Sequence, residues 1–128
     1  MAQDSSPFED LYDPERKKLT AAGAFLKENI DVAANFTEHL TGGEIDSVDE
    51  LRPGSGALVR ARGKKLAVYR DDGGALHVCS AVCPHMGCIV QFNSFEQCWD
   101  CPCHGSQFDV DGAVLAGPSR APLEKSQL

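Results

Sequence analysis

The six cysteines of this 128-residue chain all lie between positions 79 and 103. A small secreted domain that depends on disulfides spreads its cysteines along the chain, whereas a tight group that includes histidines is typical of a metal site. Two segments stand out: residues 83–88, Cys-Pro-His-Met-Gly-Cys, and residues 101–106, Cys-Pro-Cys-His-Gly-Ser. A shared site requires a fold that brings these two loops together.

The spacing predicts which side chains bind the metal. The pattern is Cys-x-His, fifteen residues, then Cys-x-x-His, and the candidate ligands are Cys83, His85, Cys101 and His104. Thiolates hold iron in iron–sulfur clusters, and neutral imidazole binds iron without adding negative charge. Two cysteines on one iron and two histidines on the other favour electron uptake at the histidine-bound iron. We therefore expect a [2Fe–2S] cluster that passes single electrons.

Two other interpretations use the same residues. Zinc accepts two cysteines and two histidines, and spacing alone does not exclude it. The further cysteines and the Gly-Ser after His104 are not needed by zinc and favour the cluster. A catalytic Cys101–His104 pair would also require an oxyanion site and an orienting group, and the sequence indicates neither. We expect Cys79 and Cys98 to be buried reduced thiols.

The first third of the chain is expected to be helical. Residues 1–18 are predicted to form a polar lead-in, and apolar residues at helical spacing predict an amphipathic helix from about Thr20 to Leu40 that stops at Gly42-Gly43. Its apolar stripe, which includes Phe25, Val32 and Phe36, has to be covered, either by the β domain or by a larger domain absent from this chain. A lone histidine in this region, His39, is expected to be structural, as is His77 further along.

The rest of the chain has the pattern of β structure. A hairpin is expected from strands 57–62 and 65–70 around Gly63-Lys64, followed by strands at 75–80, 88–92, 97–100, 108–110 and 113–115. We therefore predict a mainly β protein, an antiparallel sandwich or barrel. The expected domains are a helical lead-in or linker at 1–43 and a cluster domain at 44–128.

Charge and hydropathy narrow the possible partners. The net charge is −7, and residues 1–50 hold 12 acidic and 4 basic side chains. A nucleic-acid-binding face would need to be basic, so we expect no nucleic-acid partner. The acidic half is interpreted as a solvated helical face, or else as a surface for a basic partner. No stretch is long enough to span a membrane and the N-terminus lacks a secretory signal, so we expect a cytoplasmic protein.

The two loop segments resemble the signature boxes of Rieske proteins. The second is identical to Cys-Pro-Cys-His-Gly-Ser, and the first differs from Cys-Thr-His-Leu-Gly-Cys only at Pro84 and Met86. The resemblance, which runs from about Ala57 to Leu123, implies that the four candidate ligands hold a [2Fe–2S] cluster. It also implies a disulfide between Cys88 and Cys103, and a Gly117-Pro118 loop that covers the cluster. The implied fold has three small antiparallel sheets, with the cluster subdomain inserted in a basal one.

Two positions beside the second box bear on the reduction potential. In respiratory Rieske proteins, a Ser and a Tyr after this box hydrogen-bond to a bridging sulfide and a ligand thiolate. Ser106 matches the Ser, but Phe108 stands at the Tyr position and has no hydroxyl. The resemblance therefore implies a reduction potential below that of the respiratory proteins.

A second resemblance concerns the segment before the boxes. Residues 11–17, 25–33 and 47–57 resemble the joining segment of bacterial FAD-dependent oxidoreductases, in which an amino-acid-oxidase-like flavin domain precedes a C-terminal Rieske domain. This implies an FAD-dependent parent enzyme, with an upstream flavin domain or redox protein as the partner. The chain itself lacks a Gly-x-Gly-x-x-Gly loop for FAD. The alternatives are a free-standing Rieske ferredoxin that serves an oxygenase or reductase, or a subunit of a respiratory complex.

Overall fold

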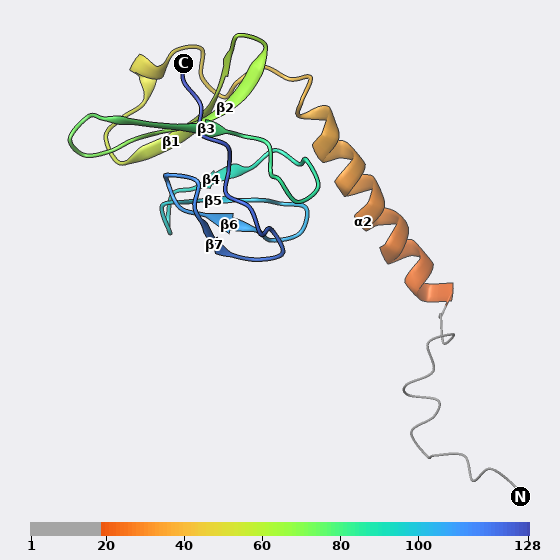
Figure 1. Ribbon diagram of the computed structural model, residues 1–128. Helices are drawn as coiled ribbons and strands as arrows, with labels where there is room; N and C mark the ends of the chain where they lie inside the picture. Colours follow the sequence, from red (N-terminus) through yellow and green to blue (C-terminus); the bar gives the residue numbers. More distant parts are fainter. Residues whose placement is uncertain (1–18) are drawn as a thin grey trace, which may run out of the picture. The chain divides into compact units, whose positions relative to one another are not determined.

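The computed structural model describes residues 19–128, without the side chains of residues 19–21, 28, 31, 32, 35 and 36. The chain divides into two compact units, residues 1–30 and 31–128, and each is described by itself. Figure 1 shows one α-helix followed by short strands in the described residues. Within the described part, no helix has both the length and the apolar character needed to cross a membrane.

Helix α2 spans Leu19–Thr37, so it ends three residues before the predicted Leu40 and does not reach Gly42-Gly43. The prediction was wrong there because Leu40 N donates to Thr37 O at 2.8 Å, an i to i−3 bond that closes a turn and does not continue the α-helix. Phe25, Leu26 and Ile30 are exposed on the helix. The side chains of Thr20, where the helix was expected to start, and of the stripe residues Val32 and Phe36 lie outside the described part, as does the lead-in 1–18.

The first sheet contains strands β1 (Ser55–Ala61), β2 (Lys64–Arg70) and β3 (Leu76–Ser80), paired antiparallel in that order. The predicted hairpin is confirmed, but its turn is Arg62-Gly63 rather than Gly63-Lys64. Both turn residues have positive φ, 50° and 75°, as a two-residue hairpin turn with right-handed strand twist requires. A short 3-10 turn, η1 (Val48–Glu50), precedes β1 and has a capping box between Ser47 and Glu50.

The second sheet contains β4 (Gln91–Asn93), β5 (Cys98–Asp100), β6 (Gln107–Phe108) and β7 (Val114–Ala116), antiparallel in chain order. The strand expected at 88–92 begins later, because Ile89 forms a separate bridge with Val82. The mainly β class is confirmed. The described strands form two sheets rather than three; the remaining pairings are isolated bridges such as Ile45 with Val59.

The buried residues form two apolar clusters, and one of them lies directly under the loops of interest. It contains the large side chains Trp99 and Phe108 together with Cys83, Cys101 and Ile89. The other cluster, around Leu66 and Val68, packs against the first sheet from the side of η1. The two candidate ligand cysteines are therefore part of the packed core, which restricts how far their loops can move.

Candidate metal centre

Loop 1, residues 83–88, connects the end of β3 to the start of β4. Its backbone closes on itself: Cys83 N donates to Cys88 O at 2.8 Å, and Gly87 N donates to Cys83 O at 2.9 Å. Gly87 has a φ of 77°, a conformation that favours glycine over residues with a side chain. These bonds form a tight loop that begins at a cysteine.

Loop 2, residues 101–106, connects β5 to β6 and repeats this arrangement. Cys101 N donates to Ser106 O at 2.7 Å, and Gly105 N donates to Cys101 O at 3.0 Å. Gly105 has a φ of 73°. Cys83 and Cys101 thus occupy the same position in two loops with the same hydrogen-bond frame.

The structure places the two candidate ligand cysteines together in the interior. Cys83 is 1% exposed and Cys101 is 3% exposed, and the thiol of Cys83 lies close enough to Cys101 to influence its pKa. Burial raises the pKa of Cys101 and the thiol of Cys83 adds to the rise, whereas the backbone N–H groups of Cys103 and His104 act in the opposite direction. Because metal binding requires a thiolate, N–H groups directed at this sulfur fit a metal-binding role.

The two candidate ligand histidines lie together on the outside. His85 and His104 are both exposed. Their ring centroids are 4.9 Å apart, and the rings are nearly perpendicular, at 87°. Each loop therefore contributes one buried sulfur and one exposed imidazole, and like donors from the two loops lie side by side.

A disulfide joins the loops beside these donors. Cys88, the last residue of loop 1, is bonded to Cys103, the third residue of loop 2, and their Cα atoms are 6.5 Å apart. The sulfur of Cys101 lies within 4.8 Å of both disulfide sulfurs. With these two cysteines oxidised, the thiol and imidazole donors that remain on the two loops are Cys83, His85, Cys101 and His104. This donor set fits a centre with one sulfur-bound and one nitrogen-bound metal ion.

Loop 2 is packed against the proline loop, residues 117–119. A Cβ on Gly117, which has a φ of 95°, would lie 2.5 Å from Gly105 O and from Ser106 Cα. Ser119 N donates to the hydroxyl of Ser106 at 3.1 Å, and Ser106 is fully buried. Beneath it, Phe108 is also fully buried. The proline loop therefore contacts loop 2 so closely that position 117 has no space for a side chain.

The remaining cysteines lie elsewhere in the two sheets. Cys79 and Cys98 are buried free thiols. Burial, followed by hydrogen bonding to Asp100, raises the pKa of Cys98 to about 11. Glu96, Cys98 and Asp100 have ligand atoms within 4.8 Å of one another, but Gln107 Nε2 donates to both carboxylates. These contacts already satisfy the group without a metal ion.

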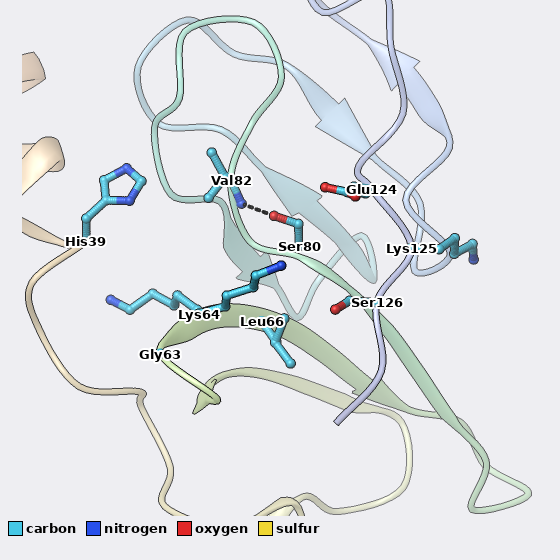
Figure 2. Close-up of a pocket in the computed structure, with 10 residues that line it drawn as sticks. His39, Gly63, Lys64, Leu66, Ser80, Val82, Glu124, Lys125 and Ser126 are labelled. Atoms are coloured by element: carbon cyan, nitrogen blue, oxygen red, sulfur yellow. Dashed lines mark hydrogen bonds between the residues drawn. The ribbon is translucent and has the colours of Figure 1, made fainter.

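His39 is the residue near the centre whose role the sequence did not reveal. Its Nε2 donates to the carbonyl of Gly87 in loop 1 at 2.7 Å, across 48 positions of sequence. It also lines a cavity of about 450 Å³ with Lys64, Ser80 and Val82, shown in Figure 2. None of the four candidate ligands lines this cavity, so it is separate from the candidate centre. No local motif marks such a long-range contact.

Comparison with known proteins identifies this arrangement. The family model described as "Rieske [2Fe-2S] domain" matches residues 43–127. A protein of Bacillus subtilis (strain 168) named as a Rieske 2Fe-2S iron-sulfur protein is 35% identical over 127 residues, which is 96% of this chain and 24% of the relative. The cytochrome b6-f complex iron-sulfur subunit of Chlorobaculum thiosulfatiphilum is 35% identical over 89 residues, 64% of this chain and 49% of that subunit.

The fold is similar to solved structures as well. The ferredoxin of carbazole 1,9a-dioxygenase from Nocardioides aromaticivorans IC177 superposes with a TM-score of 0.50 at 27% identity, covering 66% of this chain and 86% of the ferredoxin. The chain thus spans nearly all of this small structure. By contrast, it spans about a quarter to a half of the two curated relatives.

Proposed function

The chain belongs to the Rieske [2Fe–2S] domain family, and from that premise we propose that Cys83, His85, Cys101 and His104 hold its cluster and that the chain transfers single electrons. The family's cofactor is a [2Fe–2S] cluster. The observation that supports this ligand set is the sorting of donors in two equivalent loops: a buried pair of thiols and an exposed pair of imidazoles. When bound, such a cluster accepts and releases one electron at a time.

The residues of this chain set the conditions for that transfer. Cys83 and Cys101 anchor the centre in the packed core, and their burial keeps water from the sulfur side. His85 and His104 face solvent, so an approaching redox protein can come close to the imidazole side. The disulfide Cys88–Cys103 keeps the two loops from separating, and the proline loop packs against loop 2.

Absorption and electron paramagnetic resonance (EPR) spectroscopy of the purified chain test the ligand assignment. We expect a coloured protein with equal amounts of iron and acid-labile sulfide, and a loss of the signal in Cys83→Ser and His104→Ala. Cys98→Ser is the matched control, because Cys98 is equally buried but lies outside both loops, and it should retain the cluster. A colourless wild-type protein that contains zinc would contradict the proposal.

We further propose that this domain works as the C-terminal part of an FAD-dependent oxidoreductase. The joining-segment resemblance supports this, as does the B. subtilis relative, which matches nearly the whole chain yet is about four times longer. Sequencing the gene upstream of Met1 tests it. A continuous reading frame that encodes a flavin domain is the expected result, and a full-length protein that binds no flavin would contradict it.

The second candidate is a free-standing Rieske ferredoxin. It is favoured by the similarity to the dioxygenase ferredoxin, 86% of which this chain covers. A start codon and ribosome-binding site at Met1 would support the ferredoxin and exclude the fusion. The protein would then be an electron carrier without a fused enzyme domain.

A further inference from the structure

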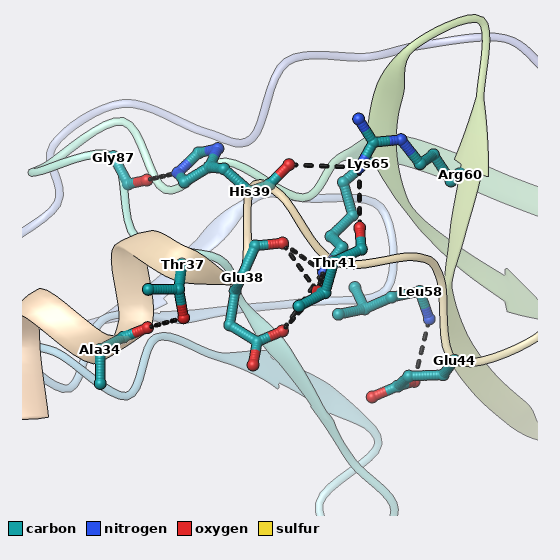
Figure 3. A network of polar contacts seen from close by, with 10 residues as sticks. All are labelled: Ala34, Thr37, Glu38, His39, Thr41, Glu44, Leu58, Arg60, Lys65 and Gly87. Atoms are coloured by element: carbon teal, nitrogen blue, oxygen red, sulfur yellow. Dashed lines mark hydrogen bonds and ion pairs between the residues drawn. The ribbon is translucent and has the colours of Figure 1, made fainter.

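The carbonyls of Gly87 and Gly105 occupy the same position in the two cluster loops, but different parts of the chain contact them. Gly117 of the proline loop packs against the Gly105 carbonyl, at a distance that leaves no room for a Cβ. The Gly87 carbonyl instead accepts a hydrogen bond from Nε2 of His39, 2.7 Å away, as Figure 3 shows. His39 therefore contacts loop 1 at the position that is equivalent to the one where the proline loop contacts loop 2.

His39 is itself held by two cations of the first hairpin. Arg60 Nη1 donates to the carbonyls of His39 and Thr41, at 3.2 and 2.7 Å. Lys65 Nζ donates to the carbonyl of Glu38 at 2.6 Å and to the hydroxyl of Thr41 at 2.8 Å, and it pairs with the carboxylate of Glu38 at 3.3 Å. Figure 3 shows these bonds converging on residues 38–41 from one side. We call residues 38–41 the clamp segment.

The clamp segment is held firmly. The side chain of Lys65 is 4% exposed, so its ammonium group relies on these three acceptors rather than on water. Hydrogen bonds from a charged donor are stronger than neutral ones, and leaving a buried charge unpaired is costly. The backbone around His39 therefore has little freedom, and its imidazole is directed at loop 1 by a rigid support.

We propose that His39 is a positioning residue of the metal centre: by donating to the Gly87 carbonyl, it holds loop 1 in the frame that presents Cys83 and His85. His39 lies outside the family match, which begins at residue 43, so this role is an addition to the family's own loops. The assignment of Cys83 and His85 as ligands rests on the proposed function. The clamp segment, which lies within the expected linker at residues 1–43, then also supports the metal centre.

Hydrogen exchange and EPR of the intact chain test the proposal with His39→Ala and His39→Gln. Loss of the bond in His39→Ala should speed exchange of the loop 1 amides of Cys83 and Gly87 by about fivefold and leave those of loop 2 unchanged. The EPR g-values should shift, because the backbone of loop 1, which presents Cys83 and His85, has changed its conformation. Glutamine places an N–H donor at a similar reach, so His39→Gln should restore both readouts.

A second pair of variants tests the support. Lys65→Met removes the buried cation and should give the loop 1 pattern of His39→Ala, whereas Lys64→Met, its exposed neighbour, should behave as wild type. Unchanged loop 1 exchange in His39→Ala, equal acceleration in both loops, or failure of His39→Gln to restore the signal would each overturn the proposal. The exchange readout needs no cluster, so a colourless wild type would refute the ligand assignment and leave this test intact.

Discussion

Loop 1 and loop 2 share a backbone frame, yet they differ in where their support comes from. Each begins with a buried cysteine and has a glycine of positive φ at its fifth position. Loop 2 is packed against the proline loop, about a dozen residues later in the chain. Loop 1 depends on a hydrogen bond from a residue 48 positions earlier. The comparison shows that one backbone frame, used twice, can rely on close packing in one copy and on a single long-range hydrogen bond in the other.

The largest effect is expected from filling the contact between loop 2 and the proline loop. Gly117→Ala places a Cβ 2.5 Å from backbone atoms of Gly105 and Ser106, at a φ of 95°. We expect a loss of about 4 kcal/mol in the free energy of unfolding, from the clash and the backbone strain together. Urea denaturation measures this loss of stability, and the iron content shows whether the centre is retained.

Gly63→Ala is the matched control for that variant. Gly63 has a similar positive φ of 75°, but nothing lies within 4 Å of its added Cβ. It should lose only about 1 kcal/mol, the cost of strain without a clash, and keep its iron. Equal losses in the two variants would show that the packing of the proline loop adds nothing to loop 2.

The disulfide is a direct covalent cross-link between the two loops, and its removal should have the next largest effect. In the chain-entropy model, cross-linking residues 15 positions apart stabilises a fold by about 3 kcal/mol. The double variant Cys88→Ser, Cys103→Ser should therefore unfold at lower urea concentration. A loss much below 1 kcal/mol would mean that packing already holds the loops together.

A smaller effect is expected on the reduction potential. Phe108 is fully buried beneath loop 2. By the resemblance to respiratory Rieske proteins, it matches a position at which they have a tyrosine. Phe108→Tyr should raise the potential by about 40 mV, because a new hydrogen bond that favours the reduced centre by ~1 kcal/mol corresponds to that shift for one electron. Redox titration followed by EPR measures it, and an unchanged or lower potential would contradict the assigned role of this position.

The smallest effect concerns a site remote from both loops. Hydrogen bonds from His77 to Asp111 and then Asp71, at 3.0 and 3.4 Å, raise the pKa of His77 above its usual 6.5 despite partial burial. The protonated form is therefore favoured by folding. This stability is fully present below pH 6.5 and is lost as the pH rises through the raised folded pKa.

The urea midpoint should accordingly fall between pH 6 and pH 8, and the slope should flatten in His77→Gln. The exchange rates of the loop 1 and loop 2 amides, corrected for intrinsic pH dependence, should not differ between wild type and this variant. If His77→Gln altered either loop, the two loops could no longer be treated as independent of the first sheet.

Much of the fold followed from local patterns. The hairpin and the mainly β class were predicted because strand alternation and turn residues are recognised within a few positions of sequence. The boundaries of the elements were predicted less well. The first hairpin turn is one residue earlier than predicted, because Arg62 adopts a positive φ that its residue type does not suggest. The helix ends at Thr37, and the segment after it is held by Arg60 and Lys65, contacts that no local pattern reveals.

The amino-acid sequence is enough to propose the donor set, because only a few residue types bind metal and because their spacing within each loop follows from tight-turn geometry. It also determined which glycines and cysteines those loops contain. Only the tertiary structure decided that the thiols lie inside and the imidazoles outside, that Gly117 must lack a side chain, and that His39 contacts loop 1. The difference arises from the sequence distance between the interacting residues. Ligand chemistry and turn conformation depend on neighbouring residues, whereas burial and packing depend on segments that are far apart in the sequence and that folding brings together.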